Sequence, residues 1–325
     1  MKVLISAQDP GGANSVIPVA KAFIERGDEV VAQVEGAARD MCTARDIPQG
    51  DMHDPDVVVV GTSGGPSIEK QVTEAMHGTA PVIAVLDFWS NYWQRFSNPG
   101  AKDFAYLPDI VCVIDDIAKE EMIAEGFPAE RLVITGNPHF DHFADGITRT
   151  DEDQKRILFI SQPIRSDALL PGFATPTTDE YQMLEAIRTA LPEGYNLFIR
   201  LHPRDERNKY DRYLDSRVHM ASEATLEEAL SKSGLIIGPA TPVLMQATAA
   251  GKKVLCYGPS LQGPDELVSN RAGVTTRIDS PEELKRVLAA YAEGTWPFEN
   301  RPLREVWPTG ATERVVEMAL SLTTQ

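Results

Sequence analysis

Short apolar runs alternate with amphipathic segments along the chain. In the first 150 residues the runs are rich in β-branched residues and have the length of single strands; they are Val3–Ile5, Val30–Val34, Val57–Val60, Val82–Leu86, Ile110–Ile114 and Leu132–Ile134. Segments of helical length lie between them, for example Val16–Glu25, Ile68–Met76 and Ile117–Glu125. Continuous apolar strands separated by helices predict a parallel sheet that is buried on both faces.

A polar segment, residues 147–156, interrupts this alternation and is predicted to be a linker. A second series of expected strands follows at Ile157–Ile160, Leu197–Leu201, Leu235–Ile237, Val254–Tyr257 and Val274–Ile278. Thr177, Thr225 and Ser280 each precede a Glu by three positions, the spacing of a capping box at a helix start. Thr309–Leu322 is expected to form a terminal helix that returns toward the first domain.

This pattern predicts an α/β protein with two Rossmann-like domains, residues 1–150 and 151–325, that face a cleft. A chain of 325 residues has the length expected for two domains. Ligands of open α/β sheets bind beyond the carboxyl ends of the strands. The loops that follow the strands are therefore the places to search for chemistry.

The chain is strongly acidic, with 31 Lys and Arg against 48 Asp and Glu and a net charge of −17. Such a surface repels polyanions, which argues against binding of nucleic acid or of an anionic membrane. The charge is uneven, because residues 1–150 carry a net −12 and residues 151–325 a net −5. The second domain is thus the better candidate to bind a phosphorylated ligand.

The three cysteines, Cys42, Cys112 and Cys256, are far apart and form no CxxC motif, which argues against a zinc ribbon and a disulfide framework. No apolar stretch approaches the 18 residues of a membrane span, and the N-terminal run is too short for a signal peptide. We therefore expect a cytoplasmic protein that has no membrane-spanning segment. Nothing in the sequence fixes its oligomeric state, and a homo-oligomer is one possibility.

The loop after the first strand contains Asp9, Gly11 and Gly12. The two glycines let the backbone approach a ligand closely, and Asp9 is a candidate base at the mouth of the expected cleft. The loop matches neither GxGxxG nor GxxxxGK[ST], which makes dinucleotide binding a weak prediction and excludes a P-loop. A tight turn before a helix is the structural alternative.

The loop after the fourth strand carries Asp87, Trp89, Asn91 and Arg95. Aromatic faces beside polar groups suit the binding of a sugar or another acceptor, and Asp87 is a second candidate base. The alternative is structural, because Trp89, Trp93 and Phe96 have the spacing of one buried helix face.

After the sixth strand, Gly136 and Pro138 shape a turn that carries Asn137 and His139. His139 and His142 are too few ligands for a metal site, so no metal is predicted. A turn that lines the cleft or acts as a hinge is the preferred interpretation.

Two loops of the second domain are candidates to bind phosphate. Arg200 lies near the end of an expected strand, His202 and Arg204 lie where that strand ends, and arginine forks with a histidine donor suit phosphate oxygens. After Gly238, Thr241 is the expected N-cap of a helix whose start can also seat a phosphate. A surface turn and a structural helix are the alternatives for these two loops.

With these motifs the chain resembles the GT-B superfamily of glycosyltransferases and its relatives of the UDP-GlcNAc 2-epimerase type. The resemblance rests on Thr135-Gly-Asn-Pro-x-x-Asp141, on Leu201-His-Pro203 and on the segment Gly238–Gly251. His202-Pro203 is also similar to a motif of bacterial polysialyltransferases and glycerophosphotransferases. The resemblance implies that His202 and Thr241 contact the donor phosphate.

The resemblance further implies a nucleotide-sugar co-substrate and no other cofactor. Gly238, Gln246, Asn137 and His139 are the implied contacts of the donor nucleoside and sugar. Gln246 stands where many UDP-sugar enzymes have a ribose-binding Glu. Gly11, Gly12, Trp89, Asn91 and Arg95 are the expected contacts of a small or glycan acceptor.

Our first hypothesis is therefore a metal-independent glycosyltransferase that moves a sugar from a nucleotide donor to a hydroxyl acceptor, with Asp9 or Asp87 as the base. The first alternative is a sugar-nucleotide 2-epimerase or hydrolase, for which Asp9, Asp87 and Asp141 are the candidate carboxylates. The second is a protein that binds a nucleotide sugar without turning it over. The base, the sugar, the acceptor and the stereochemistry are left open.

Overall fold

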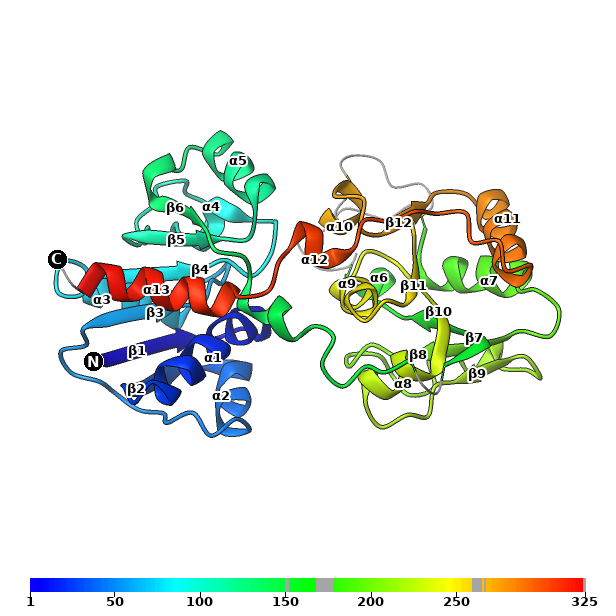
Figure 1. Cartoon of the computed structure of the whole chain (residues 1–325), viewed down its shortest axis with the longest axis horizontal. Helices are drawn as coiled ribbons and strands as arrows, with labels where there is room; N and C mark the ends of the chain where they lie inside the picture. The colour runs from blue at the N-terminus through cyan, green and yellow to red at the C-terminus, as the bar shows by residue number, and fades with distance from the viewer. Residues whose placement is uncertain (150–151, 168–177, 259–264, 266, 324–325) are drawn as a thin grey trace. The chain divides into compact units, whose positions relative to one another are not determined.

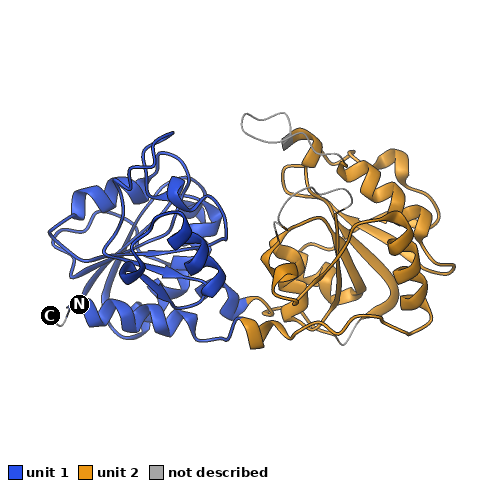
Figure 2. Ribbon diagram, turned by 90° about the horizontal axis from the view of Figure 1, so that it is seen from above, with its two compact units in different colours: residues 1–142, 307–325 blue, residues 143–306 orange. Residues whose placement is uncertain are grey.

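The structure is a computed structural model of the whole chain, and it describes all residues except 150–151, 168–177, 259–264, 266 and 324–325. The chain divides into two compact units (Figure 2). Unit 1 consists of residues 1–142 and 307–325, and unit 2 of residues 143–306. The division after His142 precedes the boundary expected at residue 150, and the last part of the chain belongs to unit 1.

Unit 1 contains a six-stranded parallel sheet with the order β2-β1-β3-β4-β5-β6 (Figure 1). Its strands are β1 (Lys2–Ala7), β2 (Glu29–Val34), β3 (Val57–Val60), β4 (Val82–Val85), β5 (Ile110–Val113) and β6 (Leu132–Ile134). All six strands that the apolar runs predict are present. The four valines of β3 and all of β4 are buried, as expected for strands covered on both faces.

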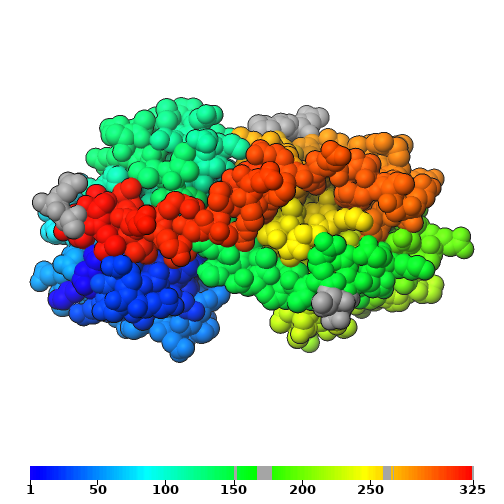
Figure 3. All heavy atoms as spheres, in the orientation of Figure 1, coloured from blue at the N-terminus to red at the C-terminus, as the bar shows by residue number. Residues whose placement is uncertain are grey.

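The described helices of unit 1 are α1 (Pro10–Glu25), α2 (Gly36–Thr43), α3 (Ile68–Met76), α4 (Tyr92–Arg95), α5 (Asp116–Ala124) and α13 (Ala311–Thr323), with the 3-10 turns η1 (Ala129–Arg131) and η2 (Pro138–His142). Helix α13 is the expected terminal helix, and it lies against α1 on the surface of unit 1 (Figure 3). Val315 and Ala319 of α13 join the core formed by α1 and by Val3 and Ile5 of β1. The chain end thus completes the hydrophobic core of unit 1.

Unit 2 contains a second six-stranded parallel sheet with the order β12-β11-β10-β7-β8-β9. Its strands are β7 (Asp153–Ile160), β8 (Asn196–Arg200), β9 (Val218–Met220), β10 (Ser233–Gly238), β11 (Lys253–Tyr257) and β12 (Thr276–Ile278). The sequence pattern predicts five of them and misses β9. The predicted linker is wrong in its second half, because β7 begins at Asp153.

Arg156 explains why a polar segment can start a strand. Its side chain is buried, its guanidinium donates to both carboxylate oxygens of Glu223 at 3.0 Å, and it lies over the ring of Phe198. A charge buried with a partner satisfies its hydrogen bonds, whereas the linear sequence shows only a polar residue.

The described helices of unit 2 are α6 (Ile164–Asp167), α7 (Glu180–Ala190), α8 (Leu226–Lys232), α9 (Pro242–Ala249), α10 (Val268–Arg271), α11 (Pro281–Ala292) and α12 (Leu303–Val306), with the turn η3 (Asp211–Tyr213). The expected caps at Thr225 and Ser280 are confirmed, since each side chain accepts a backbone N–H three residues on. Thr177 lies outside the described residues, and Asp179 caps α7 instead.

Each sheet has one point at which the strand order reverses, between β1 and β3 in unit 1 and between β7 and β10 in unit 2. The loops that leave two such strands diverge and open a crevice at their carboxyl ends. None of the helices in the described part of the chain is long and apolar enough to cross a membrane.

Candidate functional site

At the reversal point of unit 1, the loop after β1 is shorter than the sequence suggests. Helix α1 begins at Pro10 rather than near Val16, so Gly11 and Gly12 belong to its first turn. Asp9 is the N-cap residue, its side chain makes no capping hydrogen bond, and it is exposed. The prediction that Gly11 and Gly12 lie in a loop before the helix was therefore wrong, while their contact with a ligand stays a prediction. Proline at the first helical position is the signal that marks this start.

The two glycines let three loops meet. A methyl group on Gly11 would overlap Oδ2 of Asp87, and one on Gly12 would lie 3.3 Å from the backbone nitrogen of Thr62. The loops after β1, β3 and β4 therefore approach one another more closely than side chains at these positions would permit.

Asp87 and Arg95 form a half-buried ion pair at this junction. Arg95 Nη1 donates to Asp87 Oδ1 at 2.6 Å and to Thr62 Oγ1 at 2.8 Å, and the Thr62 hydroxyl donates to Asp87 Oδ1 at 3.1 Å. The two side chains are 16% and 9% exposed. Asp87 Oδ1 is thus held in place, while Oδ2 faces the start of α1. Thr62 is a member of this group that the sequence analysis does not identify.

Glu69 is a second buried carboxylate at the same end of the sheet. It lies in the first turn of α3 and is 3% exposed. Its Oε1 accepts the backbone N–H of Gln8 and the hydroxyl of Ser63, both at 2.9 Å, while Oε2 is buried without a hydrogen-bond partner among the described residues. Nothing in the local sequence indicates this role, because a Glu near a helix start is usually exposed.

The aromatic loop is mainly structural. Trp89 is buried, its indole donates to Asp115 Oδ1 at 2.9 Å, and its ring packs on Phe140 and Trp307. The predicted acceptor contact of Trp89 is therefore not at the surface, and the structural alternative describes it better. That alternative errs in detail, since α4 starts only at Tyr92. Asn91 has a left-handed backbone and an exposed side chain.

The turn after β6 also serves the architecture of unit 1. Asn137 is buried; its amide donates to the carbonyl of Asp87 at 3.0 Å and its oxygen accepts from the hydroxyl of Ser15 at 3.1 Å. The carboxylate of Asp141 accepts from the backbone and hydroxyl of Thr312 at the start of α13. Asp141 is therefore occupied by a helix end, and the donor contact of Asn137 stays a prediction.

His139 lies in the same turn and is half-buried. Burial, and to a smaller extent the neighbouring His142, lowers the pKa of His139 to about 4. The ring is therefore neutral at physiological pH. No group of three or more His, Cys, Asp or Glu side chains in the described part of the chain is arranged to hold a metal ion.

Unit 2 has a pocket of about 520 Å³ at the carboxyl ends of β7, β8 and β9. Its polar lining includes Arg200, His202 and Arg207, and its apolar lining includes Met220 and Val243, among other residues. Arg200 and His202 thus meet in one pocket. Arg204 is exposed and is not part of the lining.

The ring orientation of His202 is fixed by its own turn. The backbone N–H of Arg204 donates to Nδ1 at 3.2 Å, so the neutral ring carries its hydrogen on Nε2. The backbone N–H of His202 donates to Asp205 Oδ2 at 3.0 Å. A histidine held in this way can present a hydrogen-bond donor to an anion.

A buried network supports that turn. Asp205 accepts from the hydroxyl of Ser161 at 2.7 Å and from Lys209 at 2.7 Å, and Lys209 pairs with Glu180 at 2.9 Å. Burial opposes charge on Lys209, but its bonds to Asp205 and Glu180 outweigh this and raise its pKa. Burial raises the pKa of Tyr210 to about 12, and its hydroxyl shares a hydrogen bond with the hydroxyl of Ser161. Sequence analysis misses this network, because its members are dispersed along the chain.

Thr241 is the N-cap of α9, as expected, with Pro242 at the first helical position. Its buried hydroxyl does not cap the helix and accepts from Gln162 Nε2 at 3.3 Å. Gly238 packs against Ile160, where a methyl group would lie 3.2 Å from its Cβ. The expected phosphate contact of Thr241 stays a prediction.

Gln246 lies on α9, and its amide donates to Oε1 of Glu227 at 3.4 Å. Glu227 comes from the neighbouring helix α8. A carboxylate is therefore present beside the position at which the sequence shows only an amide. The two side chains together offer donors and an acceptor suited to hydroxyl groups.

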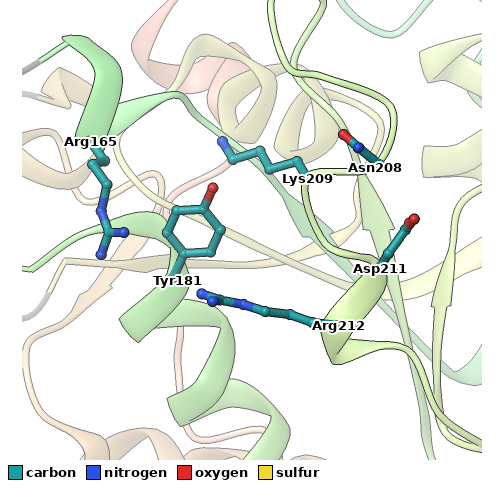
Figure 4. Close-up of a pocket in the computed structure, with 6 residues that line it drawn as sticks. All are labelled: Arg165, Tyr181, Asn208, Lys209, Asp211 and Arg212. Carbon is teal, nitrogen blue, oxygen red and sulfur yellow. The ribbon is translucent and has the colours of Figure 1, made fainter.

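Figure 4 shows a second pocket of unit 2, of about 390 Å³, in which Arg165, Lys209 and Arg212 surround the ring of Tyr181. Their charged groups lie 4.8, 5.6 and 5.3 Å from the ring centroid. Lys209 is already paired with two carboxylates and Arg165 with Asp179. Lys209 therefore lines this pocket and also belongs to the network that supports the turn of His202 through Asp205.

Comparison with known proteins shows which solved structures share the fold of this chain. No family model matches the sequence, and no curated protein matches it significantly. Among solved structures, UDP-GlcNAc 2-epimerase from Neisseria meningitidis bound to UDP-GlcNAc is similar over 99% of this chain and 100% of its own, at 16% identity and a TM-score of 0.67. The S. aureus MnaA–UDP structure covers 100% and 98% at 16% identity and a TM-score of 0.69.

MurG from Acinetobacter baumannii is similar over 98% of this chain and 99% of its own, at 15% identity and a TM-score of 0.60. These proteins share the GT-B architecture, and the chain has this fold over nearly its whole length. The predicted fold class, with two Rossmann-like domains, is confirmed.

Proposed function

We propose that the protein acts on a nucleotide sugar, whose diphosphate binds in the 520 Å³ pocket of unit 2. The observation that carries this proposal is the convergence of Arg200 and His202 at the carboxyl ends of β7 and β8, beside the start of α9. Guanidinium and imidazole donors with a helix N-terminus are a typical phosphate environment. The Gln246–Glu227 pair on the helices α9 and α8, which also contribute Val243 and Leu226 to the pocket lining, supports ribose binding.

For the reaction, isomerisation at C2 or hydrolysis of the sugar is the first candidate. The solved structures named as 2-epimerases align with TM-scores of 0.64 to 0.71, above the 0.60 and 0.61 of MurG and of a kitacinnamycin glycotransferase. Inverting C2 requires removal of its proton and return of a proton to the opposite face. Asp87, fixed by Arg95 and Thr62, is the carboxylate we assign to this chemistry.

Glycosyl transfer is the second candidate, and the state of Asp9 favours it. Asp9 is exposed after β1, and its side chain has no hydrogen bond or ion pair among the described residues. Such a carboxylate is available to deprotonate the hydroxyl of an acceptor. In this reaction too, the positive groups of unit 2 stabilise the departing diphosphate.

The binding step is tested first, by isothermal titration of UDP, GDP, CMP, CDP and dTDP. We expect one diphosphate to bind and His202→Ala to weaken it by roughly ten- to a hundredfold, because a hydrogen bond to a charged group contributes about 1.5–3 kcal/mol. His53→Ala is the matched control, since His53 is exposed in unit 1. Equal affinity in wild type and His202→Ala refutes the phosphate assignment.

The reaction is then identified with the corresponding nucleotide sugar in D2O without an acceptor. Epimerisation gives the C2 epimer with deuterium at C2, as seen by proton NMR, and hydrolysis gives free sugar without deuterium. Turnover that requires an added hydroxyl compound identifies a transferase. If a nucleotide sugar binds and none of these products forms, the protein binds the nucleotide sugar without turning it over.

A further inference from the structure

The charge around the carboxyl ends of β1, β3 and β4 is not balanced. Two carboxylates, Asp87 and Glu69, are held there by the loops after the strands. Arg95 compensates Asp87 at 2.6 Å. Glu69 has no cation within ion-pair distance in the part of the chain that the structure describes.

Its neighbour Lys70 forms no ion pair with it; burial lowers the pKa of Lys70, and the charge of Glu69 opposes this shift without outweighing it. Lys70 Nζ donates to the carbonyls of Gln94 and Ser97, both at 2.8 Å, and lies over the ring of Tyr106. Apart from its charge interaction with Lys70, Glu69 has one backbone N–H and one hydroxyl as donors to Oε1, while Oε2 makes no hydrogen bond with a described residue.

A buried carboxylate oxygen without a partner costs free energy, because water no longer solvates it. Ser6 Oγ, at the end of β1 just before Gln8, is also buried and unpartnered among the described residues. Unsatisfied buried polar atoms are rare in native proteins and concentrate where function requires them. Two of them at one end of the unit 1 sheet indicate such a place.

We propose that Glu69 is a positioning and electrostatic residue of the unit 1 site, retained as a carboxylate so that its negative charge, which no ion pair with a described residue neutralises, favours positive charge developing on a bound sugar. The inference rests on the proposed function. In each candidate reaction the bond between the anomeric carbon and a diphosphate oxygen breaks, its electron pair leaves with the diphosphate, and positive charge develops on the ring. In hydrolysis or transfer, the oxygen of water or of the acceptor forms the new bond to this carbon and gives its proton to the base. In epimerisation, the base takes the C2 proton, and the diphosphate oxygen re-forms its bond to the anomeric carbon as a proton returns to the opposite face of C2. A fixed charge in a low-dielectric site acts strongly on such a change.

Glu69 also positions the loops through its two hydrogen bonds. Its Oε1 joins the backbone of Gln8, before α1, to Ser63, which follows Thr62 of the Asp87 group. An amide oxygen can accept the same two bonds. Glu69→Gln therefore removes the charge and keeps the positioning, which separates the two roles.

The test compares wild type, Glu69→Gln and Glu74→Gln. Glu74 is an exposed residue of the same helix, so its variant makes the same change in net charge in solvent. For Glu69→Gln we expect a Tm equal to or above that of wild type, because a desolvated charge is removed. We also expect kcat to fall about tenfold or more with KM within about twofold, because a transition-state interaction is lost. Glu74→Gln should match wild type in Tm, kcat and KM.

Each other outcome overturns the inference. A kcat of Glu69→Gln within twofold of wild type shows that the charge has no role in the reaction. A lower Tm shows that Glu69 is an ordinary structural residue, whatever happens to kcat. If wild type turns over no nucleotide sugar, the proposed function itself fails, whereas an active wild type with an equally active Glu69→Gln refutes only the role of Glu69.

Discussion

Lys209→Met removes the central cation of the buried network under the turn of His202. Lys209 Nζ lies 2.9 Å from Glu180 Oε1 and 2.7 Å from Asp205 Oδ1. The three side chains are 8%, 2% and 2% exposed. Methionine has a similar length and fills the space of the lysine stem, so the variant deletes charge with little loss of packing.

The expected loss of stability follows from this burial. At an effective dielectric constant of about 20, each attraction is worth roughly 6 kcal/mol, and most of it is offset by the cost of removing the ions from water. Removing one partner leaves two buried carboxylates uncompensated, which costs about 3–5 kcal/mol. For a unit of this size, roughly 2–4 °C per kcal/mol predicts a Tm of unit 2 lower by about 6–20 °C.

The stability that Lys209→Met loses depends on pH, because Asp205 and Lys209 both titrate differently in the folded and unfolded states. Burial raises the pKa of Asp205, but bonds from Lys209, Ser161 and the backbone of His202 outweigh it, and the net pKa is lowered. A lowered carboxyl pKa contributes stability above the unfolded value of 3.8, and this stability is lost as the pH falls through the folded value. The raised pKa of Lys209 contributes fully below 10.5 and is lost at higher pH.

Scanning calorimetry at about pH 7 and then at decreasing pH measures both effects. The Tm difference between wild type and Lys209→Met should be largest near neutral pH and narrow below about pH 4. Arg188→Met is the control, because Arg188 is 39% exposed and its pairs with Glu185 and Asp215 contribute about 0–1 kcal/mol. A Lys209→Met melting curve within about 2 °C of wild type at pH 7 refutes this reasoning.

Two further substitutions and one titration test unit 1. Arg95→Met leaves Asp87 without its cation and should lower the Tm of unit 1 by about 6 °C or more; a change below about 2 °C contradicts the ion pair. Gly11→Ala places a methyl group against Asp87 Oδ2 and should cost about 1–3 kcal/mol and reduce turnover, whereas Gly65→Ala, with open space around it, should match wild type in both assays. Burial lowers the pKa of His139 to about 4, so its ring should stay neutral down to about pH 5 in an NMR titration. Its unfolded pKa is 6.5. The contribution of His139 to the stability of the fold is therefore full above pH 6.5 and decreases as the pH falls toward 4.

The strands were predictable because each buried strand is a run of consecutive apolar residues. Eleven apolar runs correspond to eleven strands, since a parallel sheet covered on both faces requires continuous apolar segments. Strand β9 escaped because Val218–Met220 is short and contains His219 at an edge of the sheet. The start of α1 escaped because Gly11 and Gly12 disfavour a helix, although Pro10 favours its beginning.

The site was predictable only in part, because loop chemistry depends on partners far away in sequence. Arg200 and His202 were found together, since they are two residues apart at the end of one strand. The support of that loop comes from Ser161 and Lys209, which lie on either side of it in the chain and which hydrogen bonds bring to Asp205. A charged residue is usually exposed, so nothing in the local sequence distinguishes a buried lysine from a surface one.

Comparison of the buried carboxylates distinguishes support from candidate chemistry. Glu180 and Glu69 are both nearly inaccessible, at 2% and 3% exposed. Glu180 is satisfied by Lys209 and by the backbone N–H of Arg165, as expected for a group that stabilises the fold. Glu69 has two neutral donors and no ion pair with a described residue, although Lys70 is adjacent; Lys70 is hydrogen-bonded to carbonyl groups and interacts with Glu69 only at longer range. Stability alone favours pairing of these two neighbouring charges, so its absence gives Glu69, rather than Glu180, a claim to function.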